Sequence, residues 1–342
     1  MTGLVAVDAR AAIRPEAGGV ERVTRELTSR LPALRPERYR VLAPPPRLAH
    51  RAGHLWEQIA LPVRARDAEL LLCPANASPI AGRRNVVFVH DLAALVEPDW
   101  YGGAYGRWHR LLLRAAARRA RLAIVPSETV RDELVDRLAM PRERIAVAPL
   151  GVDPAQFHGG IAADPLRRRL ALERPYVLAV GTAIARKNLG LLDRAAPALA
   201  DAGLDVVVAG GDRGYMRGDA VAAGARRLGH VAERDLAALY AGAAAFALPS
   251  LYEGFGLPCI EAMACGTPVV TTDRGALAET CGDAALYVDP GDPDALARAC
   301  LLAAHDAATR ERLVAAGHRR AAGLTWDRTA RAVDGAIGSA LA

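Results

Sequence analysis

The chain has 342 residues, of which 52% are hydrophobic and 24% are charged, so it holds enough apolar material for two globular domains. The formal net charge of +6 is small and scattered, which argues against nucleic-acid binding but suits an anionic small molecule or surface. No run of 18 uncharged apolar residues occurs, and the first residues lack the pattern of a signal peptide, so we expect a cytoplasmic protein.

Short apolar runs alternate with helical patterns from the start of the chain. In the first half, strands are predicted over residues 4–8, 39–43, 69–73, 85–90, 121–126 and 145–149, with helices that include 20–31 and 127–139. Apolar runs without alternation, joined by helices, are typical of parallel sheets that are covered on both faces. The first half therefore indicates an α/β domain.

A Gly/Pro-rich stretch over residues 150–160 precedes a fresh series of strands and helices. In this second half, strands are predicted over residues 176–180, 204–209, 228–231, 244–248, 268–272 and 285–289, followed by helices that include 292–305 and 325–341. We therefore predict a first domain over 1–152, a second over 153–324 and a terminal helical segment over 325–342.

The most informative motif runs from Phe246 to Val270. A predicted strand ends at Pro249, a glycine-containing loop follows, and a helix begins with Pro258 and stops before Gly266. Ligands of parallel α/β sheets bind at such carboxyl ends of strands. The backbone amides of this loop are expected to approach hydroxyls or phosphate oxygens closely.

Two carboxylates flank this loop. Glu261 is predicted to lie in the first helical turn, where it has a structural explanation because it complements the helix dipole. Glu253 lies in the loop between a tyrosine and a glycine and has no comparable explanation. Lys187 is also conspicuous, because it is the only lysine in a chain whose other basic residues are all arginine.

The run Pro-Ser-Leu-Tyr-Glu253-Gly-Phe-Gly-Leu-Pro, continued by Glu261-Ala-Met-Ala-Cys-Gly-Thr-Pro-Val-Val, resembles the signature of retaining GT-B glycosyltransferases of family 4. The likeness extends over nearly the whole chain, from Gly18-Gly19 and His90-Asp91 to Val180-Gly181 and Arg186-Lys187. It implies two Rossmann-like domains that face each other across a cleft. It also implies that the helix over 325–342 packs back on the first domain.

The resemblance implies a role for each matched residue. Glu261 would accept hydrogen bonds from ribose hydroxyls, and Glu253 would contact hydroxyls of the transferred sugar. The backbone at Val231 would meet the nucleobase. The diphosphate would be held by the cations Arg186 and Lys187, by the glycine turn at Gly181, and by Gly18 and Gly19 of the first domain. The loop amides that would assist at the sugar belong to Gly254, Phe255, Gly256 and Leu257.

His90 is expected beside the transferred sugar, so that His90, Glu253, Arg186 and Lys187 form the predicted catalytic set. Each assignment has a plain structural alternative. Arg186 and Lys187 also fit a solvated basic turn, His90 a hydrogen-bonded strand end, and Gly18-Gly19 an ordinary turn before a helix.

The expected reaction is transfer of a mannosyl- or glucosyl-type hexose, with retention, from a GDP- or UDP-linked sugar to a saccharide, glycolipid or natural-product acceptor. No Asp-x-Asp occurs at a strand end, and five cysteines form no C-x-x-C pair, so we expect a transferase that uses no metal and no resident cofactor. Both carboxylates are assigned to binding, which favours front-face transfer assisted by the departing phosphate. Alternatives are a GT-B epimerase or hydrolase, a non-catalytic sugar-nucleotide-binding subunit, and a nicotinamide dehydrogenase, although the first strand is followed by no G-x-G-x-x-G.

The segment over residues 100–121 is basic and aromatic. It fits peripheral contact with the inner face of an anionic membrane or with a lipid-linked acceptor. It fits equally well an ordinary surface helix in which Leu111, Leu112 and Ala115 face the core and the arginines are solvated.

Overall fold

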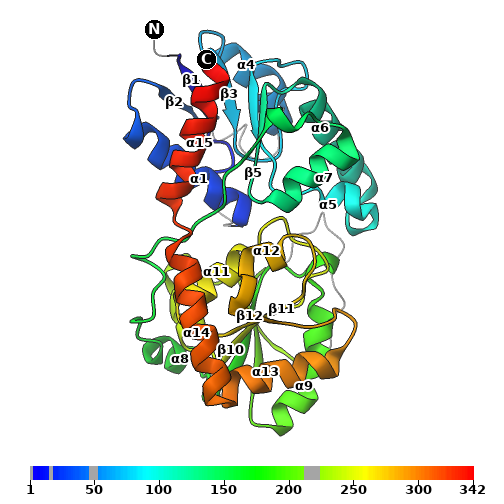
Figure 1. Cartoon of the computed structure of the whole chain (residues 1–342), viewed down its shortest axis with the longest axis vertical. Coiled ribbons are helices and arrows are strands. Elements are labelled where there is room, and N and C mark those ends of the chain that lie inside the picture. The colour runs from blue at the N-terminus through cyan, green and yellow to red at the C-terminus, as the bar shows by residue number, and fades with distance from the viewer. Residues whose placement is uncertain (1–2, 15–17, 46–52, 212–223) are drawn as a thin grey trace. The chain divides into compact units, whose positions relative to one another are not determined.

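A computed structural model describes residues 3–14, 18–45, 53–211 and 224–342. The chain divides into two compact units. The first comprises Met1–Val96, Gly103–Leu150 and Trp326–Ala342, and the second comprises Glu97–Gly102 and Gly151–Thr325. Each unit contains one six-stranded sheet with helices packed around it, as Figure 1 shows. The expectation of two Rossmann-like α/β domains is confirmed.

The first unit is built on a parallel sheet in the order β2-β1-β3-β4-β5-β6. Its strands are β1 (Val5–Asp8), β2 (Tyr39–Leu42), β3 (Leu70–Cys73), β4 (Asn85–Phe88), β5 (Leu122–Val125) and β6 (Ile145–Val147). Its helices are α1 (Gly19–Leu34), α3 (Gly53–Leu55), a π-helix (Trp56–Ala60), α4 (Leu61–Arg64), α5 (Ala93–Val96), α6 (Gly103–Arg119), α7 (Glu128–Leu138), a 3-10 turn (Arg142–Arg144) and α15 (Trp326–Leu341).

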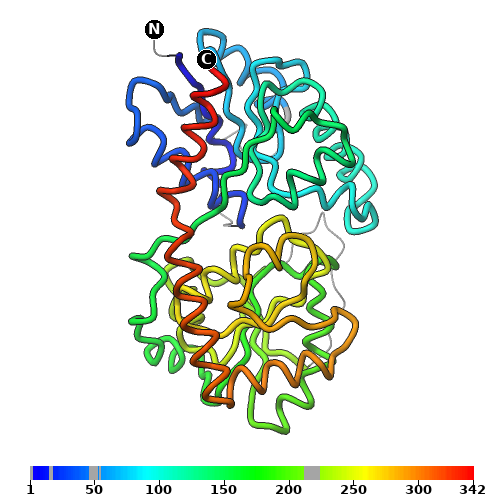
Figure 2. Tube along the Cα trace, in the orientation of Figure 1, coloured from blue at the N-terminus to red at the C-terminus, as the bar shows by residue number. Residues whose placement is uncertain are grey.

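The apolar runs of the sequence become the core of this sheet, since every residue of β1, β3, β4 and β5 is buried. Helices α6 and α7 cover β4 and β5 through side chains such as Leu113 and Leu134. Helix α15 lies beside α1 (Figure 2). Its Asp334 accepts hydrogen bonds from Arg35 Nε at 2.7 Å and from the hydroxyl of Tyr39 at 2.7 Å, which fixes α15 to this unit.

The α6 helix corrects the core assignment made for the segment over 100–121. Leu112 is buried as expected, but Leu111 is 47% exposed and Leu113 takes its place in the core. Residues that follow one another on a helix point about 100° apart, so only part of an apolar run can face the sheet. None of the described helices is long and apolar enough to span a membrane.

The second unit is built on a parallel sheet in the order β12-β11-β10-β7-β8-β9. Its strands are β7 (Tyr176–Val180), β8 (Asp205–Ala209), β9 (Arg226–Gly229), β10 (Ala245–Leu248), β11 (Val269–Thr271) and β12 (Ala285–Tyr287). Its helices are a 3-10 turn (Pro98–Trp100), α8 (Asp164–Arg169), a 3-10 turn (Ala185–Lys187), α9 (Leu189–Asp201), α10 (Glu233–Ala241), α11 (Leu257–Ala264), α12 (Leu277–Cys281), a 3-10 turn (Gly282–Ala284), α13 (Pro293–His305) and α14 (Ala307–Ala322).

Strands occur at every predicted position within the described residues, and their ends differ by one or two residues. The strand predicted over 85–90 stops at Phe88, because the backbone N–H of His90 donates to Asn76 Oδ1 at 2.6 Å and leaves the ladder. The strand predicted over 228–231 lies at Arg226–Gly229, since Gly229 has a φ of +65° and turns the chain there.

Candidate active site

The topology of the second sheet marks one position for a ligand. From β7 the chain moves outward to β8 and β9, and it then returns to the other side of β7 as β10. The loops after β7 and β10 therefore leave neighbouring strands in opposite directions, and parallel α/β sheets bind ligands at the carboxyl ends of the strands at such a switch point. These are the loops that carry Arg186-Lys187 and Glu253.

Hydrogen bonds join the two loops. The N–H of Leu251 donates to the carbonyl of Arg186 at 2.8 Å, and Arg186 Nη1 donates to the carbonyl of Tyr252 at 2.7 Å. Asn188 adopts a left-handed conformation with φ +52°, and its side-chain amide donates to the carbonyl of Pro249 at 3.1 Å. Arg186 and Lys187 thus lie in a 3-10 turn fixed to the second loop, ahead of α9, which begins at Leu189.

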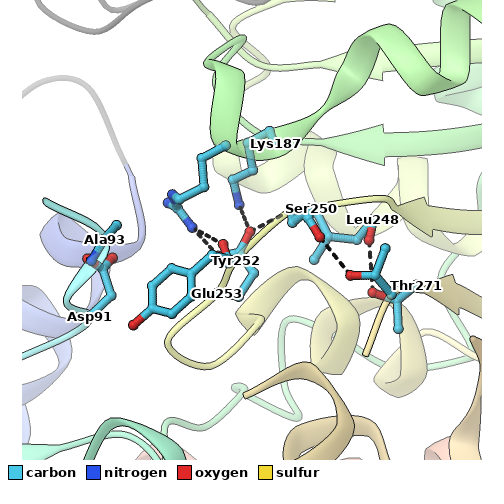
Figure 3. A network of polar contacts seen from close by, with 10 residues as sticks. Asp91, Ala93, Lys187, Leu248, Ser250, Tyr252, Glu253 and Thr271 are labelled. Atoms are coloured by element: carbon cyan, nitrogen blue, oxygen red, sulfur yellow. Dashed lines mark hydrogen bonds and ion pairs between the residues drawn. The ribbon is translucent and has the colours of Figure 1, made fainter. Parts of the chain in front are cut away.

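Glu253 is the centre of this site (Figure 3). Its Oε1 accepts hydrogen bonds from Lys187 Nζ at 2.6 Å and from Ser250 Oγ at 2.7 Å, and its Oε2 lies 2.7 Å from Arg186 Nη1. Glu253 is 6% exposed and Lys187 is 9% exposed. The structure therefore brings three of the four predicted catalytic residues into one buried ion-pair network.

The charge state of Glu253 follows from this network. Burial alone raises the pKa of a carboxyl group, but the charges of Arg186 and Lys187 and the hydrogen bonds from Lys187 and Ser250 outweigh it, so the pKa of Glu253 falls to about 2. Glu253 is consequently ionised at neutral pH. Ser250 lies within the motif but was not among the predicted site residues, because its residue type alone does not reveal the contact with Glu253.

The loop amides form a second feature of the site. Phe255, Gly256 and Leu257 are buried, and among the described residues their backbone N–H groups donate to no acceptor. They lie where the loop meets the amino terminus of α11, with Gly256 at the N-cap in a left-handed conformation of φ +94°. Buried N–H groups are nearly always paired in native proteins, so this row of donors is suited to a bound oxygen ligand.

The structure corrects the explanation given for Glu261. Helix α11 begins at Leu257, so Glu261 lies in its second turn rather than its first, where the helix dipole gives it little support. Glu261 is 2% exposed, and its carboxylate accepts a hydrogen bond from the hydroxyl of Tyr240 at 2.9 Å. Tyr240 lies on α10 and was not among the predicted site residues, because its contact with Glu261 joins residues that are 21 apart on the chain.

Glycines allow the backbone to approach closely around the site. Gly181 and Gly210 follow neighbouring strands with φ of +155° and +147°, and a Cβ atom at Gly210 would overlap the carbonyl of Gly181. A Cβ atom at Gly275 would overlap the backbone of Glu253 in the same way. Of these three glycines, only Gly181 was among the predicted site residues. The feature of the sequence that could have indicated Gly210 is the glycine pair directly after the predicted strand over 204–209.

Val231 lies at the same edge of the second sheet, after β9 and before α10. In the strand order, β8 separates β9 from β7, so Val231 lies two strands away from the loop that holds Lys187.

Among the described residues, no group of three or more His, Cys, Asp or Glu side chains is placed to hold a metal ion.

The remaining predicted residues belong to the first unit. His90 is 8% exposed, stacks on Phe88, and places Nε2 at 2.6 Å from the carbonyl of Pro74. Because a carbonyl only accepts, Nε2 carries the proton, and Nδ1 of the neutral ring is an acceptor. Burial lowers the pKa of His90, which the bond to Pro74 and nearby carboxylates only partly offset.

The two predicted glycines form the amino terminus of α1. Gly18 is the N-cap residue, and its N–H donates to Glu21 Oε2 at 3.1 Å. A Cβ atom at Gly19 would meet nothing within 4 Å, so packing does not require glycine at this position.

Comparison with known proteins gives two family matches. A family described as glycosyl transferases group 1 matches residues 174–306, and a family described as glycosyltransferase family 4 matches residues 39–156. The chain is 32% identical over 256 residues to O-antigen chain mannosyltransferase B of Escherichia coli, which covers 71% of this chain and 67% of that protein. It is 37% identical over 246 residues to D-inositol 3-phosphate glycosyltransferase of Salinispora tropica, which covers 64% of this chain but only 51% of that relative.

Solved structures share the fold over nearly the full chain. Sucrose-phosphate synthase from Thermosynechococcus elongatus superposes with a TM-score of 0.76 at 21% identity, covering 98% of each chain. Anabaena HepE in complex with UDP-glucose superposes with a TM-score of 0.76 at 17% identity, covering 98% of this chain and 99% of that one. At these identities the likeness shows the fold, and it confirms the expected GT-B class.

Proposed function

The chain is a glycosyltransferase of family 4, and from this premise we propose that it transfers a mannosyl- or glucosyl-type hexose from a nucleoside-diphosphate sugar, with retention, to a saccharide, glycolipid or natural-product acceptor. The Escherichia coli relative is a mannosyltransferase, and HepE was crystallised with UDP-glucose. These names support a mannosyl- or glucosyl-type hexose, and the second supports a UDP-linked donor; a GDP-linked donor is proposed beside it.

One observation carries the proposal: the buried amides of Phe255, Gly256 and Leu257 adjoin the loop network around Glu253 and donate to no acceptor in the part of the chain that the structure describes. The two cations and one carboxylate leave a net charge of +1. A departing nucleoside diphosphate gains negative charge, which preorganised cations and helix amides stabilise in a site sheltered from water. These groups supply that stabilisation from the protein itself, which supports transfer without a metal ion.

The state of Glu253 favours a binding role over a covalent one. A carboxylate with a pKa of about 2 is a weak base, and both of its oxygens accept hydrogen bonds from neighbouring side chains. It is therefore a poor nucleophile and has no proton to donate as a general acid. We propose that Glu253 accepts hydrogen bonds from sugar hydroxyls while the departing phosphate assists attack on the same face.

The other residues receive their roles within this proposal. Glu261 accepts from the ribose hydroxyls, and the backbone at Val231 meets the nucleobase. In the first unit, Gly19 offers its amide to the diphosphate, whereas Gly18 does so only by giving up its bond to Glu21 Oε2. His90 offers Nδ1 as an acceptor to a hydroxyl of the sugar or the acceptor substrate. Neutral His90 suits this role, since a protonated ring has no acceptor nitrogen.

The test is titration calorimetry of the purified protein against UDP, GDP, ADP and TDP, with and without EDTA. One nucleotide should bind tightly in EDTA, and Lys187→Met should weaken that binding at least about tenfold through loss of a charged contact. Arg194→Gln is the matched control, because it removes an exposed positive charge of the same unit outside the site. Equal affinity in both variants, or binding only with added metal, would contradict the site assignment.

Retention is tested separately once a donor is known. Proton NMR of the first product released from that donor reports the anomeric configuration directly. An inverted product would overturn the proposed stereochemistry, and a glycosyl adduct on Glu253 found by mass spectrometry would overturn front-face transfer.

A further inference from the structure

A cavity of about 620 Å³ lies in the first unit. It is lined by Arg83, Arg118, Arg119, Arg121, Glu143 and Arg144, and by the last turns of α15. We call it the arginine cavity. Its lining comes from four stretches of the chain that are far apart in sequence, so only the fold brings these guanidinium groups together.

The arginine cavity lies at the amino-terminal edge of the first sheet. Arg83 comes two residues before β4, while Arg121 and Arg144 directly precede β5 and β6. In a parallel sheet these strand starts share one edge, and His90 follows the opposite end of β4. Four strand residues span roughly 13 Å, so a ligand of the cavity does not contact His90.

The charge of the arginine cavity is strongly positive. Five guanidinium groups and one carboxylate give its lining a formal charge of +4. The carboxyl ends of helices α6 and α15 also adjoin it and each contribute about half a negative charge. About three positive charges therefore remain uncompensated by these groups.

The arginines of this cavity fall into two sets. Arg121 donates through Nε and Nη2 to the carbonyl of Ala340 at 3.3 Å, and Arg144 donates to the carbonyl of Ala120, so backbone contacts hold both in place. Arg83, Arg118 and Arg119 are exposed, and none of them has a carboxylate within ion-pair distance among the described residues. Like charges held together without acidic partners repel one another, and a bound anion relieves that repulsion.

We propose that the arginine cavity binds a ligand that carries clustered phosphate groups, at a site separate from the nucleotide site. The planar fork of arginine matches phosphate oxygens in pairs, and several forks around one cavity suit several phosphates better than a single carboxylate. The same chemistry is presented by a soluble oligophosphate and by an anionic phospholipid headgroup.

The experiment uses the full chain and two probes, sodium tripolyphosphate by titration calorimetry and phosphatidylglycerol vesicles by co-sedimentation. All variants carry Lys187→Met, so that the predicted diphosphate site does not contribute. Arg118→Gln/Arg119→Gln removes two charges of the cavity. Arg66→Gln/Arg137→Gln removes two exposed charges of the same unit that do not line it. Circular dichroism verifies that each variant is folded.

We expect at least one probe to bind, with an affinity at least about tenfold lower in the cavity variant and within twofold of the parent in the control. Binding of tripolyphosphate assigns the site to a soluble phosphate, and binding to vesicles alone assigns it to a lipid headgroup. Absence of binding to both probes, or equal losses in the cavity variant and the control, overturns the proposal.

Discussion

The pairing of Lys187 with Glu253 permits a quantitative test of the site. Both residues are buried, and Lys187 Nζ lies 2.6 Å from Glu253 Oε1. The perturbation is a double-mutant cycle built from Lys187→Met, Glu253→Gln and the combination of the two. The cycle isolates the energy of the pair from the other effects of each substitution.

The expected magnitude follows from the pKa of Glu253. This pKa is about 2, against an ordinary value of 4.5, and one pKa unit corresponds to 1.36 kcal/mol, so the ionised carboxylate contributes about 3 kcal/mol to folding at neutral pH. Lys187 contributes both a charge and a hydrogen bond, while Arg186 and Ser250 remain in the variant. We therefore expect a coupling energy of about 2 kcal/mol between Lys187 and Glu253.

The pH dependence has a defined sign. Because the pKa of Glu253 is lowered on folding, its contribution is complete above pH 4.5 and is lost as the pH falls towards 2. The coupling energy should therefore be constant between pH 8 and pH 5, which separates it from any effect of histidine titration.

The assay is urea unfolding together with hydrogen exchange of the peptides that contain β7 and β10, which reports on this unit locally. The control cycle uses Arg169 and Asp235, an ion pair at 2.6 Å in the same unit whose arginine side chain is 58% exposed. Exposed pairs contribute at most about 1 kcal/mol. A coupling energy for Lys187 and Glu253 no larger than that of the control pair would refute the reasoning.

Three further predictions concern single residues. Gly210→Ala should lower the free energy of unfolding by more than about 2 kcal/mol in urea titrations, since its Cβ atom would overlap a backbone carbonyl, whereas Gly211→Ala, with open space around its Cβ, should change it by less than about 0.5 kcal/mol. Tyr240→Phe should lower the free energy of unfolding by about 1–3 kcal/mol, because buried Glu261 loses a hydrogen-bond donor. Calorimetry should also show weaker nucleotide binding. An unchanged free energy of unfolding would contradict this contact. The pKa of His90 is lowered on folding, so its contribution to stability is complete above pH 6.5 and declines below it. His90→Gln should therefore flatten the dependence of the free energy of unfolding on pH between pH 7 and pH 5.5. An unaltered slope would show that His90 does not titrate differently in the folded chain.

The sequence by itself determined the fold class, the strand positions and the family. Strands such as β1 and β5 are buried on both faces, so their apolar runs stand out from the helices around them without any tertiary information. The motif around Glu253 was equally visible, because the loop, the proline near the helix start and the second carboxylate are contiguous on the chain.

Only the tertiary structure decided which partners these residues have. Lys187 and Glu253 are 66 residues apart, and Glu261 and Tyr240 are 21 apart, so neither pairing leaves a mark in local periodicity. The arginine cavity is likewise invisible in a chain that is rich in arginine throughout. Side-chain contacts of this kind depend on which strands are neighbours in a sheet, and strand order is set by long-range packing that a local pattern does not encode.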